Sequence, residues 1–258
     1  MIAAKVDPIA DHDVSIRIEG DQRVIRSNSI TAYQTGNFPN NRNPHVIREQ
    51  RMTVRLPKKP VQAEQPTFFN LGAFGIALNG VVFVPQAAEW YLGQQGSDWQ
   101  YEPLGAAVAL GLDARYAHVQ RSGKYQHEGL PDGLMKRLGV KEGAASPIVG
   151  WSFDGFPIYA LFVDQNGKVR ELDSGYTVKS GKRPDGGNNP GGTYDGTFTA
   201  DYEWTGAGDL DECNGAFIRN ADFPGGTYAY FLTRTYPVIP RCFHGTPVEA
   251  FRPRRLQS

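Results

Sequence analysis

The densest group of side chains able to do chemistry lies in two short segments of the 258-residue chain. Residues 117–120 read Ala-His-Val-Gln, and residues 125–128 read Tyr-Gln-His-Glu. Ser122-Gly123 between them is typical of a turn, so the two segments are predicted to form a β-hairpin. A histidine and a carboxylate within reach of each other suffice for general acid–base chemistry, or for part of a metal site.

Strand alternation decides which of these side chains can meet. Gln126 and Glu128 are expected on one face of the second strand, with Tyr125 and His127 on the other. Unless a β-bulge re-aims His127, we therefore expect His118 to pair with Glu128 within hydrogen-bond range. The alternative is a solvated hairpin whose histidine and glutamate contact only loops.

Two sets of candidate site residues follow from this region and from polar positions elsewhere in the chain. The residues expected to bind a small ligand are His118, Gln120, Tyr125, Gln126, Asp154 and Tyr228. The residues expected to hold a divalent metal ion, the one cofactor considered, are His118, His127 and Glu128. Asp154 is equally well explained as a turn former. No catalytic residue is assigned, because no serine-hydrolase, metalloprotease or nucleotide-binding motif occurs in its required context.

The segments that position these residues show an internal similarity. Residues 75–80 (GIALNG) resemble residues 150–155 (GWSFDG), and each is followed by a hydrophobic run. This favours a diverged duplication with repeat cores at 75–131 and 150–245 inside a single domain, residues 1–258. Two halves of this kind should share one strand order, with the site near their junction. Chance similarity between strand-turn-strand segments is the alternative.

The composition predicts the fold class. The chain has 30 Gly, 18 Pro and 12% aromatic residues, and it lacks long segments with helical periodicity. We therefore expect an all-β protein of two related, mutually packed halves with a few short helical turns. One such helix is expected over 131–138, where Pro131 suits the start and Gly139 the end.

Charge and cysteine content bound the partners and the compartment. Lys+Arg and Asp+Glu both total 27, which argues against a nucleic-acid binder. No apolar run approaches the ~20 residues of a membrane span, and no signal peptide is recognised. Cys213 and Cys242 are either one disulfide or two buried thiols.

Several motifs, kept in one order along the chain, resemble the YHYH-domain family. They are TGNFPN at 35–40, LNGV at 78–81, AHVQ at 117–120, DGFPIY at 154–159, DECNG at 211–215 and GTYAY at 226–230. Members of that family are known mostly as exported bacterial proteins of unknown function. The resemblance therefore implies a periplasmic or extracellular location.

The motif that names the family is altered in this chain. Where the family has Tyr-His-Tyr-His before Gly-Leu-Pro, this sequence has Gln126 and Glu128 in place of the two histidines. Three hypotheses about function stay open. The first is a ligand- or metal-binding module, the second is a hydrolase or isomerase that uses a His/Glu acid–base pair, and the third is a structural or adhesive component of a cell surface or virion.

Overall fold

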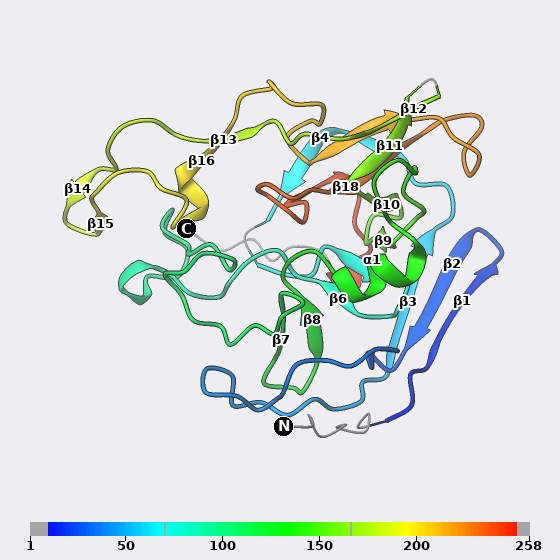
Figure 1. Ribbon diagram of the computed structural model, residues 1–258, viewed down its shortest axis with the longest axis horizontal. Helices are drawn as coiled ribbons and strands as arrows, with labels where there is room; N and C mark the ends of the chain where they lie inside the picture. The colour runs from blue at the N-terminus through cyan, green and yellow to red at the C-terminus, as the bar shows by residue number, and fades with distance from the viewer. Residues whose placement is uncertain (1–9, 70, 166, 252–258) are drawn as a thin grey trace.

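An eight-stranded sheet forms the centre of the molecule (Figure 1). The computed structural model describes residues 10–69, 71–165 and 167–251. The strands of this sheet are β5 (Gly75–Ala77), β6 (Val82–Phe83), β7 (Ala117–Val119), β8 (Tyr125–His127), β9 (Gly150–Ser152), β10 (Pro157–Ala160), β17 (Gly215–Ile218) and β18 (Thr227–Leu232). They are arranged in the order β17-β18-β10-β9-β5-β6-β8-β7.

Smaller sheets and short helices surround the central sheet. One three-stranded sheet consists of β1 (Val14–Glu19), β2 (Gln22–Ser27) and β3 (Met52–Pro57). Four two-stranded sheets pair β4 (Gln62–Phe68) with β19 (Cys242–Gly245), β11 (Phe162–Gln165) with β12 (Lys168–Glu171), β13 (Tyr176–Val178) with β16 (Tyr202–Trp204), and β14 (Asp185–Gly186) with β15 (Asn189–Pro190). The helical elements are α1 (Asp132–Leu138) and the 3-10 turns Tyr91–Gly93, Thr199–Asp201 and Glu249–Phe251. The predicted all-β class is confirmed.

Helix α1 lies where the sequence predicted a helix. Pro131 immediately precedes α1, and Gly139 follows its last residue in the left-handed region, at φ 78°. A glycine adopts this conformation without the steric cost that a Cβ brings, so it ends the helix. Within the described residues, no helix is both long enough and apolar enough to cross a membrane.

The central sheet consists of two halves with the same strand order. One half is β5-β6-β8-β7 and the other is β9-β10-β18-β17. Each half has an antiparallel hairpin, then a parallel pair, then an antiparallel outer strand. The two halves meet where β5 and β9 pair antiparallel, with Ile76 opposite Trp151. The shared order meets the topological condition for an internal duplication, whose origin stays a prediction.

The turns that end the two similar segments, 75–80 and 150–155, occupy equivalent places in these halves. Gly80 closes the β5–β6 hairpin at φ 75°, and Gly155 closes the β9–β10 hairpin at φ 97°. The backbone N–H of Gly80 donates to the carbonyl of Ala77 at 2.8 Å, and that of Gly155 donates to the carbonyl of Ser152 at 2.9 Å. Both turns need positive φ, which explains why each of the similar segments ends in glycine.

Aromatic packing and a disulfide hold the second half to β19. The Phe74 ring lies between Tyr230, at 4.9 Å edge-to-face, and Phe243, at 5.4 Å in a stacked arrangement. Cys213 and Cys242 are bonded, with their Cα atoms 5.1 Å apart. The disulfide is thus confirmed, and the two cysteines are not free buried thiols.

Candidate functional site

The candidate site is built on the predicted hairpin. Strands β7 and β8 pair antiparallel, with His118 directly opposite Gln126. The turn between them is closed by the backbone N–H of Gly123, which donates to the carbonyl of Gln120 at 2.8 Å. Gly123 has φ 86°, so the glycine supplies the conformation that this tight turn requires.

Three polar side chains meet on one face of the hairpin. Gln126 Nε2 donates to Glu128 Oε1 at 2.6 Å. Nδ1 of His118 lies 2.9 Å from the same oxygen. The ring nitrogen of His118 makes no hydrogen bond to this oxygen, and the contact becomes an ion pair only when the imidazole is protonated. The predicted proximity of His118 and Glu128 is confirmed, and strand alternation achieves it without a bulge.

Burial gives Glu128 an unusual protonation behaviour. Its side chain has no exposed surface. Removal from water raises the pKa of the Glu128 carboxyl, and the nearby charge of Glu89 raises it further. His118 and Gln126 act in the opposite direction because both stabilise the charged form. A carboxyl of this kind can hold or release a proton closer to neutral pH than an exposed glutamate can.

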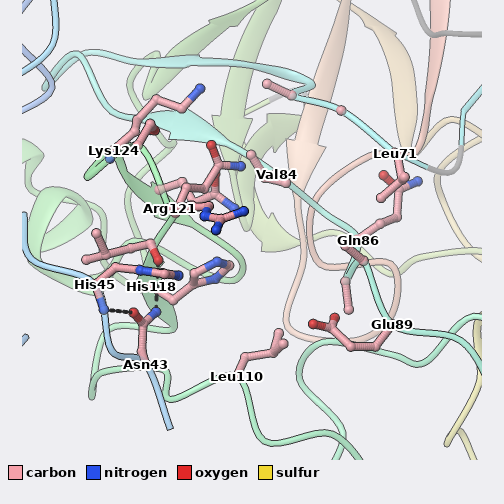
Figure 2. A pocket seen from close by; sticks show the side chains of 18 of the residues that line it. Asn43, His45, Leu71, Val84, Gln86, Glu89, Leu110, His118, Arg121 and Lys124 are labelled. Atoms are coloured by element: carbon pink, nitrogen blue, oxygen red, sulfur yellow. Dashed lines mark hydrogen bonds between the residues drawn. The ribbon is translucent and has the colours of Figure 1, made fainter. Parts of the chain in front are cut away.

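A cleft of about 720 Å³ opens beside this polar group. His118, Gln120 and Gln126 line it, and Glu128 lies behind them. Figure 2 shows His118 and Arg121 of the hairpin on one side of the cleft and Gln86 and Glu89, which belong to the segment after β6, on the other. The Lys124 side chain lies on the hairpin side and runs toward the top of this view. The cleft is of the size that small-molecule sites usually have.

The other three predicted ligand-binding residues lie elsewhere. Tyr125 is on the opposite face of β8, where its hydroxyl donates to Asp113 Oδ2 at 2.7 Å. Tyr228 makes the same contact in the second half, donating to Asp211 Oδ2 at 3.0 Å. Asp154 is buried at the β9–β10 turn. The structure therefore divides the predicted ligand set between the two halves.

The hairpin does not lie at the junction of the two halves, where the site was expected. The halves join at β5 and β9, whereas β8 and β7 are the last two strands at one edge of the sheet. The parallel pairing of β8 with β6 puts the hairpin on the outer side of its half. Pairing of the two similar segments at β5 and β9 therefore leaves the β7–β8 hairpin at the edge of the sheet.

The predicted metal set His118, His127 and Glu128 is not assembled. His127 and Glu128 are neighbours in the chain and point to opposite faces, so only Glu128 reaches His118. Among the described residues, no group of three or more His, Cys, Asp or Glu side chains is placed to hold a metal ion. His127 instead packs in the interior, with its ring centroid 5.7 Å from that of Phe83.

The burial of His127 predicts a pH effect on stability. Desolvation lowers the pKa of its imidazole from 6.5 to about 4. As pH falls, His127 takes up its proton in the unfolded chain before it does so in the folded protein. The stability that is present above pH 6.5 therefore decreases between pH 6.5 and about pH 4. The difference between these two pKa values corresponds to about 3 kcal/mol of unfolding free energy. We expect His127→Tyr, which installs the residue found at the equivalent position 230, to flatten the dependence of the unfolding free energy on pH over this range.

Urea titrations at pH 7.5, 5.5 and 4.5 measure this effect. The quantity compared is the slope of the unfolding free energy against pH. Any packing cost of the larger tyrosine ring is the same at every pH and does not change this slope. Equal slopes for the two proteins would show that His127 is not buried in its neutral form.

Several residues of the cleft were not found from the sequence. Gln86, Glu89 and His45 come from loops that are distant from the hairpin in the chain. No local signal identifies such residues, since only the folded chain brings these loops to the hairpin.

The second half shows what the fold itself requires at these positions. Its strand register places Ala216 where His118 lies and Ala229 where Gln126 lies. Phe231 follows Ala229 by two residues, as Glu128 follows Gln126. Ala229 and Phe231 belong to a hydrophobic cluster against which Ala216 packs. The same strand positions are thus apolar in one half and polar in the other.

The comparisons with known proteins agree with the motifs in the sequence. The family model described as "YHYH protein" matches residues 53–245, more than half of the chain. No curated protein and no solved structure matches the chain.

Proposed function

We propose, from the premise that the chain belongs to the YHYH protein family, that it binds a small polar ligand in the cleft beside His118, Gln126 and Glu128. The observation that carries this proposal is the fully buried Glu128 carboxyl, paired with His118 at 2.9 Å behind the wall of the cleft. Burying an ionisable group costs free energy that apolar side chains do not cost.

The two halves support a functional reason for this cost. The second half fills the equivalent positions with Ala216, Ala229 and Phe231, so this strand arrangement does not need a polar cluster. Proteins tolerate locally unfavourable residues mainly where function requires them. The polar cluster in the first half is therefore better explained by binding than by architecture.

A variant that copies the second half tests the proposal. We expect the triple variant H118A/Q126A/E128F to keep or raise the unfolding free energy and to lose ligand binding. Binding is read as the thermal shift produced by individual amino acids, neutral sugars, sugar acids and nucleosides. Glu128→Gln, which keeps shape and removes charge, serves as a second variant, and Glu64→Gln on the exposed strand β4 is the matched control.

Three results would contradict the proposal. A loss of more than about 2 kcal/mol in the triple variant and in Glu128→Gln alike would make the cluster architectural. If no probe of any class shifts the wild-type protein, or if both variants retain the shift, the cleft is not the binding site. The third hypothesis, a structural or adhesive protein, would then be favoured.

One observation also supports a hydrolase or isomerase. A carboxyl whose pKa is raised by burial can act as a general acid, and His118 is close enough to exchange a proton with it. For an enzyme, Glu128→Gln should keep ligand binding and abolish turnover. For a binding module, the variant should lose affinity.

The disulfide bears on the location of the protein. Bonds such as Cys213–Cys242 form and persist in oxidising compartments. This supports the periplasmic or extracellular location that the family resemblance implies.

A further inference from the structure

The two walls of the cleft present different polar groups to a ligand. Arg121 and Lys124 stand on the hairpin wall, with Arg42 from a neighbouring loop. Gln86 and Glu89 stand on the facing wall, as Figure 2 shows. A ligand that spans the cleft therefore meets cations on one side and oxygen acceptors on the other.

The cations on this side of the cleft form no ion pair with a carboxylate of the described residues. Each ion pair formed by described residues involves other side chains than Arg42, Arg121 and Lys124. Partial burial lowers the pKa of Lys124, and no ion pair with a described carboxylate opposes this effect. A carboxylate on a ligand would supply the missing negative charge.

The facing wall offers acceptors without donors. Gln86 donates through Nε2 to the carbonyl of Phe69 at 2.5 Å, which leaves its side-chain oxygen unpaired. Oε2 of Glu89 is also buried without a hydrogen-bond partner among the described residues. Across the cleft, on the hairpin wall, Gln126 shows a similar arrangement, because Nε2 donates to Glu128 and Oε1 has no hydrogen-bond partner among the described residues. An ammonium group has three donors, and carboxylate and amide oxygens are suitable partners for it.

We infer that the ligand is a small zwitterion, an α-amino acid or a short peptide, whose carboxylate lies toward Arg121 and Lys124 and whose ammonium group lies toward Gln86 and Glu89. This inference rests on the proposed binding function and specifies the chemistry of the ligand. A volume of about 720 Å³ accommodates an amino acid with its side chain, or a dipeptide. A simple anion would satisfy only the hairpin wall, and a simple cation only the facing wall.

Blocking one charge of the ligand at a time tests the inference. Calorimetric titration of the wild-type protein uses each of the twenty amino acids and the dipeptide glycylglycine. For each compound that binds, its N-acetyl and C-terminal amide derivatives follow. We expect each derivative to bind at least about 10-fold more weakly than the parent, because each lacks one charge-assisted contact.

Variants assign each charge to its wall. R121Q/K124Q should remove the preference for the free carboxylate over the amide while keeping the preference for the free ammonium group. Glu89→Gln should do the reverse. Lys59→Gln, an exposed cation outside the cleft, is the matched control and should change neither preference.

The possible outcomes separate the inference from the proposed function. If blocked derivatives bind as tightly as their parents, the zwitterion inference is overturned. If neutral sugars or D-gluconate bind in a Glu128-dependent manner and amino acids do not, the inference fails and the proposed function stands. If no probe binds the wild-type protein, the proposed function itself fails.

Discussion

Replacing Cys213 and Cys242 together by alanine is expected to lower the free energy of unfolding by about 3.5 kcal/mol. The disulfide closes a loop between residues 29 positions apart, and this cross-link restricts the unfolded chain. Both cysteines are fully buried, so the loss of their packing contacts lowers the free energy of unfolding further. Equilibrium unfolding in urea, with the wild-type and double-alanine proteins side by side, measures the difference.

Reduction provides an independent control for this prediction. Adding a thiol reductant should move the wild-type unfolding midpoint toward that of C213A/C242A and should leave the variant unchanged. A difference of less than about 1 kcal/mol between the two proteins would mean that the cross-link does not restrict the unfolded state as its loop length predicts.

Asp154→Ala is expected to cost about 3–5 kcal/mol of stability, more than any other single substitution considered. Asp154 is buried and accepts hydrogen bonds from the hydroxyl of Ser152, from the hydroxyl of Tyr230 at 2.5 Å and from the backbone N–H of Gly245 at 2.9 Å. Removing the carboxylate leaves the buried Tyr230 hydroxyl and Gly245 N–H without this acceptor, whereas the Ser152 hydroxyl can still donate to the carbonyl of Phe156 at 2.9 Å. Chemical unfolding measures the loss, and the binding cleft should be unaffected.

The first half contains the matched control for this substitution. Asn79 occupies the equivalent turn position, where its amide donates to the Tyr33 hydroxyl at 3.2 Å and accepts from the Val81 N–H at 3.2 Å. With fewer and longer contacts, Asn79→Ala should cost only about 1–2 kcal/mol. Equal losses at the two positions would show that Asp154 acts as a turn former alone.

Local patterns in the sequence were sufficient to predict the elements of the fold. Asn79-Gly80 and Asp154-Gly155 specify tight turns through their own backbone preferences, and Pro131 and Gly139 bracket the helix in the same way. Strand alternation likewise predicted that Gln126 and Glu128 share a face, which their 2.6 Å hydrogen bond confirms. All of these signals act within a few residues.

The residues that reach the cleft from distant parts of the chain could not be predicted from the sequence. Glu89 and His45 enter the cleft from separate loops, so no spacing in the sequence connects them with His118. The site was expected at the junction of the halves for a related reason: sequence similarity identifies equivalent strands but does not say which strand edges meet. Predicting that β5 pairs with β9, and that β7 ends the sheet, requires the three-dimensional topology.

The pairing of β5 with β9 has a consequence for assembly. An antiparallel pair of equivalent strands has two-fold symmetry, as the interface of a homodimer does. A shorter chain with residues 75–131 and without 150–245 would leave β5 as an open edge that a second copy could complete. Carrying both edges in one polypeptide makes this association intramolecular. Completion of the sheet is therefore independent of protein concentration. Because the two halves carry different side chains at the site positions, we expect one ligand per complete sheet.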